Sequence, residues 1–453
     1  MVEKKIPLSG LKKAVKEEIS LYIEKNISEK FIRIEFRTEL LDPLLWLKIQ
    51  PNTEKIYFES RGKGAPEVAC AGCALRVVPG KDEDLASYFK KLNRNIIDGQ
   101  KFYGGVSFFK DLPDKKEWAS FGHFNFILPR FEYSVREKKG FFTVNLAAAE
   151  LTEKKIVPVL RDVKDIKFDV PEKHDKAGRS EIVKCTPDKK EWIAGISSYL
   201  KKIKKGEIQK IVPARRLELK NTGKTDPFRV MYELKRAGDY TANFLMTFNG
   251  EEYFAGSTPE RLFHRDGDLL TTESLAGTAP RGNNSNDDES FGKKLLESKK
   301  ETLEHDFVTN EIVNKIDPVC ELVAISERVL LKLANLQHLY RRISGKLKKN
   351  ISDGEILEKM FPTPAVSGLP RDKCQKILLN KEPFQRGWYA GVVGFAGKDV
   401  SDYYVGIRSV LMNRERIYIY SGAGIVEGSD PGKEWEEIDL KIKKYKKILK
   451  YET

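Results

Sequence analysis

Histidine and cysteine are scarce in this chain, with five of each among 453 residues. The histidines are widely separated, which disfavours a metal centre built on imidazole ligands. Cys70 and Cys73 have CxxC spacing, but no second CxxC is present to complete a zinc site. Both lie in the apolar run 68–75, which predicts a buried strand. We therefore expect these cysteines to pack in the interior rather than to serve redox chemistry or bind a metal.

Long apolar runs are also missing. No stretch of about 18 apolar residues occurs, so no transmembrane helix is predicted. The first residues, MVEKK, lack the apolar segment of a secretory signal. Hydrophobic residues make up 40% and charged residues 33% of the chain, which is typical of a soluble globular protein. The expected location is the cytoplasm.

Acidic residues are outnumbered by basic ones, 67 against 81, which gives a net charge of +14. Such an excess can indicate a basic nucleic-acid-binding protein. However, the lysines are spread along the chain, and the runs 201–205 and 441–447 fall on predicted helix surfaces. No aromatic RNP-type strand or zinc-knuckle spacing occurs. Anionic small substrates explain the charge as well, and we expect neither a nucleic-acid nor a membrane partner.

Internal repeats and low-complexity tracts are absent, and the alternation of elements predicts an α+β fold. Strand-like runs dominate up to about residue 160, and a charged connection is expected over 162–188. The helices expected after it are 190–204, 226–237, 288–315, 323–333 and one from 433. The strands expected are 207–218, 241–248, 251–256, 260–265, 268–273 and several within 388–421. We expect large antiparallel or mixed sheets packed together with helices outside, and a β-rich region 1–185 integrated with a core over 186–453.

One segment near the C-terminus combines a glycine turn with an acidic helix start. The strand-like run 416–421 leads into Gly422-Ala423-Gly424, where glycines let backbone N–H groups approach a ligand closely. Glu437 and Lys441 then fall at i and i+4 on one helical face. A solvated surface pair is the alternative interpretation, and this segment alone does not decide between them.

The C-terminal half carries an ordered series of further motifs. They are GEIQKIVPARR (206–216), GSTPERL (256–262), TESLAGTAPRG (272–282), LEHDFV (303–308), QHL (337–339), FPTPAVSGLPR (361–371), RGWYAG (386–391), IRS (407–409) and SGAGIVEGSDPGKEWEEIDLK (421–441). In this order they resemble the chorismate-utilising enzymes, which include isochorismate, salicylate, anthranilate and aminodeoxychorismate synthases. The resemblance covers about 190–450 and implies the fold of anthranilate synthase component I. Tyr103-Gly-Gly and LPRFE (128–132) point to the menaquinone-type isochorismate synthases.

Two positions indicate which reaction the resemblance implies. The branches that transfer ammonia carry glutamine where this chain has Lys210, and a lysine there marks the branches that add water. A lysine at the position of Ala276 would mark the aminodeoxychorismate synthases. The chain therefore resembles an isochorismate synthase for menaquinone synthesis. A salicylate synthase, which also eliminates pyruvate, is the alternative.

The resemblance assigns the general base to Lys210 and the general acid to Glu260. A base lysine needs a lowered pKa, and the apolar neighbours of Lys210 fit a buried strand. A carboxyl group in an apolar pocket can stay protonated near neutrality. Without the resemblance, both residues would be interpreted as solvent-facing side chains at a strand.

The metal expected from the resemblance is Mg²⁺, held by Glu304 and Glu437 against a substrate carboxylate. Lys441, one turn beyond Glu437, balances this cluster. Glu434 and Glu436 lie beside Glu437 and are the alternatives to it.

The remaining residues that the resemblance implies bind substrate. They are Leu275, Ala276, Gly277, Thr278, His338, Tyr389, Arg408, Gly422, Ala423, Gly424 and Lys441. A cationic fork such as Arg408 suits a carboxylate, while His338 could instead be structural. Pro213 after Lys210 and Ser367 in place of a common glycine depart from the family pattern. The expected partner is chorismate alone, bound by a monomer without a glutamine amidotransferase.

Overall fold

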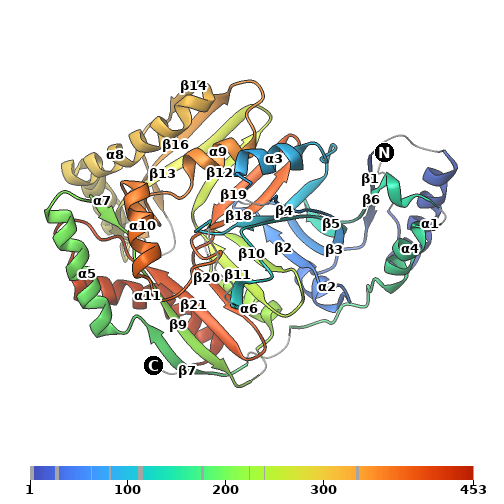
Figure 1. Cartoon of the computed structure of the whole chain (residues 1–453), viewed down its shortest axis with the longest axis horizontal. Coiled ribbons are helices and arrows are strands. Elements are labelled where there is room, and N and C mark those ends of the chain that lie inside the picture. Colours follow the sequence, from blue (N-terminus) through green and yellow to red (C-terminus); the bar gives the residue numbers. More distant parts are fainter. Residues whose placement is uncertain are drawn as a thin grey trace.

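The computed structural model describes residues 5–451 except 26–29, 63, 81–82, 111–115, 153, 175–177, 224, 239 and 333–335. In this described part, 19 strands are connected by hydrogen bonds into one sheet network, and helices lie around it (Figure 1). All the strand pairs are antiparallel, for example β13 with β16 and β3 with β5. The fold therefore has the α+β class that the sequence predicts.

The elements alternate along the whole chain. The helices are α1 (Leu8–Glu24), α2 (Pro43–Ile49), α3 (Leu85–Asn93), α4 (Ile156–Asp165), α5 (Lys189–Lys204), α6 (Pro227–Ala237), α7 (Ser285–Glu297), α8 (Lys299–Ile316), α9 (Asp353–Met360), α10 (Arg371–Lys381) and α11 (Pro431–Leu449). The strands are β1 (Phe31–Thr38), β2 (Lys55–Glu59), β3 (Glu67–Val77), β4 (Lys101–Val106), β5 (Phe124–Arg136), β6 (Lys139–Ala147), β7 (Ser180–Thr186), β8 (Lys210–Ile211), β9 (Ala214–Asn221), β10 (Ala242–Thr247), β11 (Tyr253–Thr258), β12 (Arg261–Asp266), β13 (Leu269–Pro280), β14 (Cys320–Ile325), β15 (Val329–Lys332), β16 (Leu336–Leu347), β17 (Gly368–Leu369), β18 (Val392–Gly397), β19 (Val400–Val405), β20 (Ser409–Met412) and β21 (Arg416–Gly422).

Strands from the first 185 residues pair directly with strands from the rest of the chain. β2 pairs with β10, and β4 pairs with β18. Strand β3 contains the run 68–75, which is buried up to Gly72 and half-buried beyond it; of its two unbonded cysteines, Cys70 is buried and Cys73 is half-buried. Backbone hydrogen bonds thus connect the N-terminal strands to the strands of the C-terminal half.

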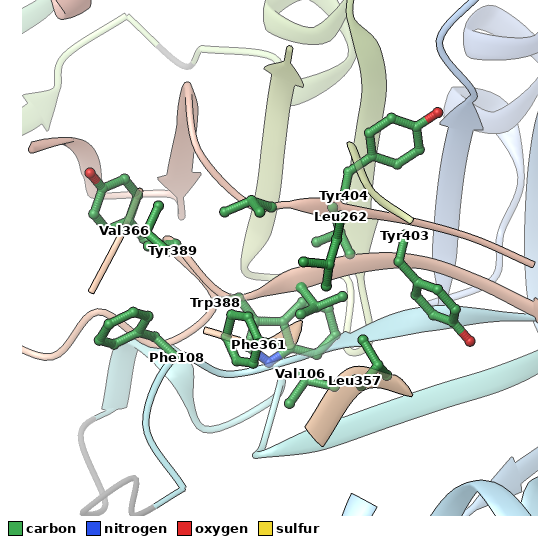
Figure 2. Packing of buried hydrophobic residues seen from close by; sticks show 14 of the residues in the cluster. Val106, Phe108, Leu262, Leu357, Phe361, Val366, Trp388, Tyr389, Tyr403 and Tyr404 are labelled. Atoms are coloured by element: carbon green, nitrogen blue, oxygen red, sulfur yellow. The ribbon is translucent and has the colours of Figure 1, made fainter. Parts of the chain in front are cut away.

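Two hydrophobic clusters fill the space between the strands and the helices. In the first cluster, the buried Trp388 lies among Val106, Leu357 and Phe361 (Figure 2). Its indole N–H donates to the carbonyl oxygen of Gly122 at 2.9 Å, which satisfies the polar atom of this large side chain. Tyr389, the next residue, belongs to the same cluster, but its ring lies apart from that of Trp388 and stacks on Tyr420 (Figure 2). The motif RGWYAG therefore places two consecutive side chains in different parts of the core.

The break at Pro213 divides the strand that was expected over 207–218. β8 ends at Ile211 and β9 begins at Ala214, because proline cannot donate to a strand ladder. β8 forms a separate two-stranded sheet with β17, in which Lys210 is opposite Leu369. Lys210 therefore lies on a short strand outside the large sheet.

Two expectations about local structure are wrong. The helix expected over 323–333 is the strands β14 and β15 as far as the described residues go, and both pair with β16. Leu322, Ile325 and Val329 are spaced like one face of a helix, but pairing with a long neighbouring strand outweighs this local pattern. The charged connection expected over 162–188 contains β7, which pairs with β9.

Among the described residues, no helix combines the length and the apolar character needed to cross a bilayer.

Candidate active site

A cavity of about 400 Å³ opens between β13, β16, β21 and α11. Its lining includes seven of the residues expected at the site: Glu260, Leu275, His338, Tyr389, Arg408, Gly422 and Lys441. These residues are separated by up to 181 positions in the chain, and the fold brings them around one space. The volume is within the range typical of small-molecule sites.

Lys210 lies at the glycine turn beside this cavity. A Cβ atom placed on Gly424 would be 3.0 Å from Cε of Lys210 and 3.6 Å from its Nζ. The backbone around Lys210 is fixed, because Ile211 exchanges hydrogen bonds with Ile425 at 3.1 and 2.8 Å. The absence of a side chain at Gly424 thus makes room for the lysine amine.

Burial lowers the pKa of Lys210 below its ordinary value of 10.5, although Glu304, Glu260 and Glu311 oppose the shift. Lys441 acts in the same direction as burial. A lysine with a lowered pKa has a larger neutral fraction near pH 7, and only the neutral amine can accept a proton.

Glu260 follows β11 and faces the cavity. Its Oε1 accepts a hydrogen bond of 3.2 Å from the hydroxyl of Thr363, and its carbonyl oxygen accepts the Val405 N–H at 3.0 Å. Burial raises the pKa of Glu260 above 4.5, against the lowering effect of the Thr363 hydrogen bond and Lys210. The shift enlarges the protonated fraction of Glu260 at a given pH, and the protonated form is the one that can act as an acid.

Lys441 connects α11 with the glycine turn. Its Nζ donates to the carbonyl oxygen of Gly422 at 2.8 Å and lies 2.6 Å from Oε1 of Glu437. Gly422 itself has no room for a side chain, since a Cβ there would lie 2.9 Å from the Pro213 carbonyl oxygen. The predicted i,i+4 pair thus contacts the turn through Lys441, while the side chain of Glu437 is 49% exposed.

Glu304 is exposed on α8, and its neighbour His305 is fully buried. Nε2 of His305 lies 3.1 Å from Oγ of Ser274, and its Nδ1 accepts a hydrogen bond of 3.2 Å from Arg328. These contacts fix α8 against β13. Glu304 is consequently held within electrostatic reach of Lys210.

Carboxylate oxygens on α8 and α11 suit a hard divalent cation. Among the described residues there is no group of three or more histidine, cysteine, aspartate or glutamate side chains that could hold a metal. Mg²⁺ is commonly bound by only one or two carboxylates together with waters and an anionic substrate. Oε2 of Glu434, one turn before Glu437, is a buried acceptor without a hydrogen-bond partner. The carboxylate oxygens of Glu304, Glu434 and Glu437 are therefore of the chemical type that Mg²⁺ binds.

Arg408 and Tyr389 also line the cavity. Arg408 has φ = 51°, a conformation that is uncommon for a side chain of this size. The described residues offer its guanidinium no hydrogen bond or ion pair. The Tyr389 ring stacks on Tyr420 with centroids 4.9 Å apart, and burial raises the pKa of Tyr389 to about 12. An unpaired arginine beside a neutral phenol suits a carboxylate.

The segment 275–278 lies within β13, whose pairing with β16 shifts register between Ala276 and Thr278, and Gly277 at this shift has φ = +71°. Nδ1 of His338 lies 3.2 Å from the Gly277 carbonyl oxygen and 3.1 Å from Oγ1 of Thr278. Burial lowers the pKa of His338, so the ring is neutral near pH 7. Leu275 and His338 line the cavity, whereas Ala276, Gly277 and Thr278 are not part of its lining; nor are Ala423 and Gly424.

Arg386 lines the cavity and is not among the residues that the sequence interpretation expected there. It is 1% exposed and donates to the carbonyl oxygens of Val366 and Val212 at 2.8 and 2.6 Å. It also pairs with Glu382 at 2.6 Å, and Glu382 accepts the Ala214 N–H at 2.9 Å. This pair fixes the chain on both sides of Pro213. Arg386 is part of the motif RGWYAG, but the sequence does not tell whether an arginine at such a position is buried in the core or binds a ligand.

Comparisons with known proteins agree with this geometry. The family profile "Chorismate binding enzyme" matches residues 14–450. The chain is 32% identical to the isochorismate synthase MenF of Haemophilus influenzae, over 94% of this chain and 93% of that protein. The structure of MenF from Escherichia coli, the menaquinone-specific isochorismate synthase, superimposes with a TM-score of 0.81 at 26% identity, covering 96% of this chain and all of that one. Anthranilate synthase component I of Streptococcus pneumoniae has a TM-score of 0.66 at 18% identity, over 93% of both chains, and so shares the fold.

Proposed function

The chain belongs to the chorismate-binding enzymes, and from this premise we propose that it is an isochorismate synthase. The observation that carries the proposal is the pair Lys210 and Glu260. Burial shifts their pKa values in opposite directions beside one cavity, towards a neutral amine and a protonated carboxyl group. Groups with such shifts are suited to serve as a base and an acid at the same pH.

In the proposed reaction, water adds to carbon 2 of chorismate, the two ring double bonds shift along the ring, and the hydroxyl group leaves carbon 4. Lys210 accepts a proton from the attacking water while the new C–O bond forms. Glu260 donates its proton to the departing oxygen, which leaves as water. Because the nucleophile is water and not ammonia, no glutamine amidotransferase is needed, and we assign the protein to menaquinone synthesis by its similarity to MenF.

The two carboxylates of chorismate are bound by different parts of the site. Arg408 and Tyr389 bind the enolpyruvyl carboxylate together with the turn 422–424, and His338 with the segment 275–278 of β13 faces the ring. Glu304 and Glu437 would hold Mg²⁺, which would supply positive charge for the ring carboxylate. Lys441 keeps Glu437 and the turn in place through its two contacts.

The N-terminal region 1–185 and the catalytic core 186–453 act as one unit in this proposal. The pairs β2–β10 and β4–β18 join them by backbone hydrogen bonds in the middle of the sheet network.

The direct test is a product analysis of the purified protein with chorismate, with and without Mg²⁺, by chromatography. Mg²⁺-dependent formation of isochorismate is expected. Formation of salicylate and pyruvate would make the protein a salicylate synthase, and no turnover would refute the proposal.

Glu437→Gln is expected to raise the Mg²⁺ concentration needed for half-maximal activity by about tenfold or more, because one anionic ligand is lost. A Mg²⁺ titration of initial rates measures this change. Glu24→Gln is the control, because Glu24 is exposed at the end of α1 and is not part of the cavity lining. If Glu437→Gln leaves the titration unchanged and Glu434→Gln shifts it, the ligand is Glu434.

Gly424→Ala is expected to lower kcat about tenfold, because the new methyl group would lie 3.0 Å from Cε of Lys210 and displace its amine. Steady-state kinetics with chorismate test this. Gly195→Ala on α5 is the control, since a Cβ there meets nothing within 4 Å. An unchanged kcat for Gly424→Ala would mean that Lys210 does not need this space.

A further inference from the structure

Arg61 from the N-terminal region and Glu273 on β13 form a charged pair next to the backbone at Glu260. Arg61 follows β2, and its side chain is 3% exposed. Its Nη1 donates to the carbonyl oxygen of Pro259 at 2.7 Å, one residue before Glu260. Its Nη2 donates to Oε2 of Glu273 at 2.5 Å. One guanidinium group thus connects the backbone at the proposed acid with a carboxylate on β13.

Arg61 is itself held on several sides. Its backbone N–H donates to the Tyr404 hydroxyl oxygen at 2.9 Å, and its guanidinium lies 4.4 Å from the centre of the Tyr240 ring. Arg261 donates to its carbonyl oxygen at 3.3 Å and pairs with Asp402. These contacts leave Arg61 little freedom to move away from Pro259.

We propose that Arg61 and Glu273 are positioning residues that together hold the backbone at Glu260 in place and set the charge around its carboxyl group. This inference rests on the proposed function, because it concerns the acid of that reaction. Arg61 fixes the backbone at Pro259, and the carboxylate of Glu273 discourages a second negative charge at Glu260. Breaking either contact acts on catalysis through Glu260, since Glu273 does not line the substrate cavity.

The charges around Glu260 come from several elements. Lys210 on β8 and Lys441 on α11 favour its ionised form, as does the hydroxyl of Thr363, and Glu273 on β13 opposes them. Tyr389 also faces it. Glu273 is the one carboxylate among the neighbours that the structure shows to raise the pKa of Glu260, so its removal has a defined sign.

Glu273→Gln keeps the shape of the side chain and removes its charge, so the pKa of Glu260 falls. The reaction requires protonated Glu260 and neutral Lys210. At high pH the rate is proportional to the protonated fraction of Glu260, which the variant reduces, whereas at low pH Glu260 is protonated in both proteins. We therefore expect the ratio of kcat/KM for Glu273→Gln to kcat/KM for wild type to be near one at the acidic end of the pH profile. At the alkaline end this ratio should be about three- to tenfold lower.

Arg61→Gln provides a test of opposite sign. It removes the positive charge and leaves Glu273 uncompensated, so the pKa of Glu260 rises and the relative activity increases from the acidic to the alkaline end. Glu132→Gln is the control: Glu132 pairs with Arg33 at 2.9 Å, is comparably buried, and is remote from the cavity lining. Its activity ratio should be independent of pH.

The experiment is a set of pH profiles of kcat/KM for isochorismate formation by the four proteins, with thermal unfolding as a check of folding. Opposite pH dependences for the variants at residues 61 and 273 support the inference. A ratio that is constant across pH for both would overturn it, even if activity is lowered. Wild-type protein that forms no isochorismate would refute the proposed function itself, and the inference with it.

Discussion

Lys210→Ala is expected to lower kcat for isochorismate formation by about 10³-fold or more, because it removes the base that accepts the proton of the attacking water. Chorismate binding should persist, since Arg408 and Tyr389 remain in the cavity lining. Rapid-quench or steady-state assays give kcat, and calorimetric titration with chorismate gives the affinity. The fold should be retained because β8 is held by backbone hydrogen bonds of Ile211.

The pH dependence of this variant distinguishes a base from a merely structural lysine. Burial lowers the pKa of Lys210, so in wild type the rate rises with pH as the amine loses its proton. The residual activity of Lys210→Ala should lack this rise, and added primary amines should restore part of it. Lys204→Ala on the exposed face of α5 is the control. Residual activity above about a tenth of wild type would contradict the assignment.

Residues in local motifs could be predicted from sequence alone. Lys210, Glu260 and Arg408 each lie in a short recognisable segment, and the structure places all three at or beside one cavity. The glycine turn was also predictable, because close approach of a backbone to another group excludes a side chain. The structure adds the specific reason, which is the position of Cε of Lys210 beside Gly424.

Contacts between distant segments could not be predicted in this way. Arg61 and Glu273 are 212 positions apart in the chain. They meet because β2 pairs with β10 and the loop after β2, which contains Arg61, reaches β13. The helix predicted over 323–333 was wrong for a related reason. The apolar spacing of this segment suits a helix, but its strands pair with β16, and this pairing cannot be inferred from the local sequence. Long-range pairing thus decides both the supporting residues and the ambiguous elements.

Glu260→Gln is expected to lower kcat by about 10² to 10⁴-fold, the usual contribution of a positioned acid or base. Glutamine has nearly the same shape, and its carbonyl oxygen can still accept the hydrogen bond of 3.2 Å from Thr363. What it lacks is a proton for the departing oxygen. The KM for chorismate should change much less than kcat, and steady-state kinetics measure both constants.

The pH profile and the stability of Glu260→Gln provide two further tests of the role of Glu260. In wild type the rate falls at high pH as Glu260 loses its proton, and the variant has no such proton to lose, so its residual activity should not decline there. Because burial raises the pKa of Glu260, the wild-type protein loses stability as pH increases from 4.5 through the raised value, whereas the variant does not. Chemical unfolding at pH 5 and pH 8 should therefore show the variant gaining stability relative to wild type at the higher pH. A variant that keeps the alkaline decline, or near-wild-type kcat, would show that another group donates the proton.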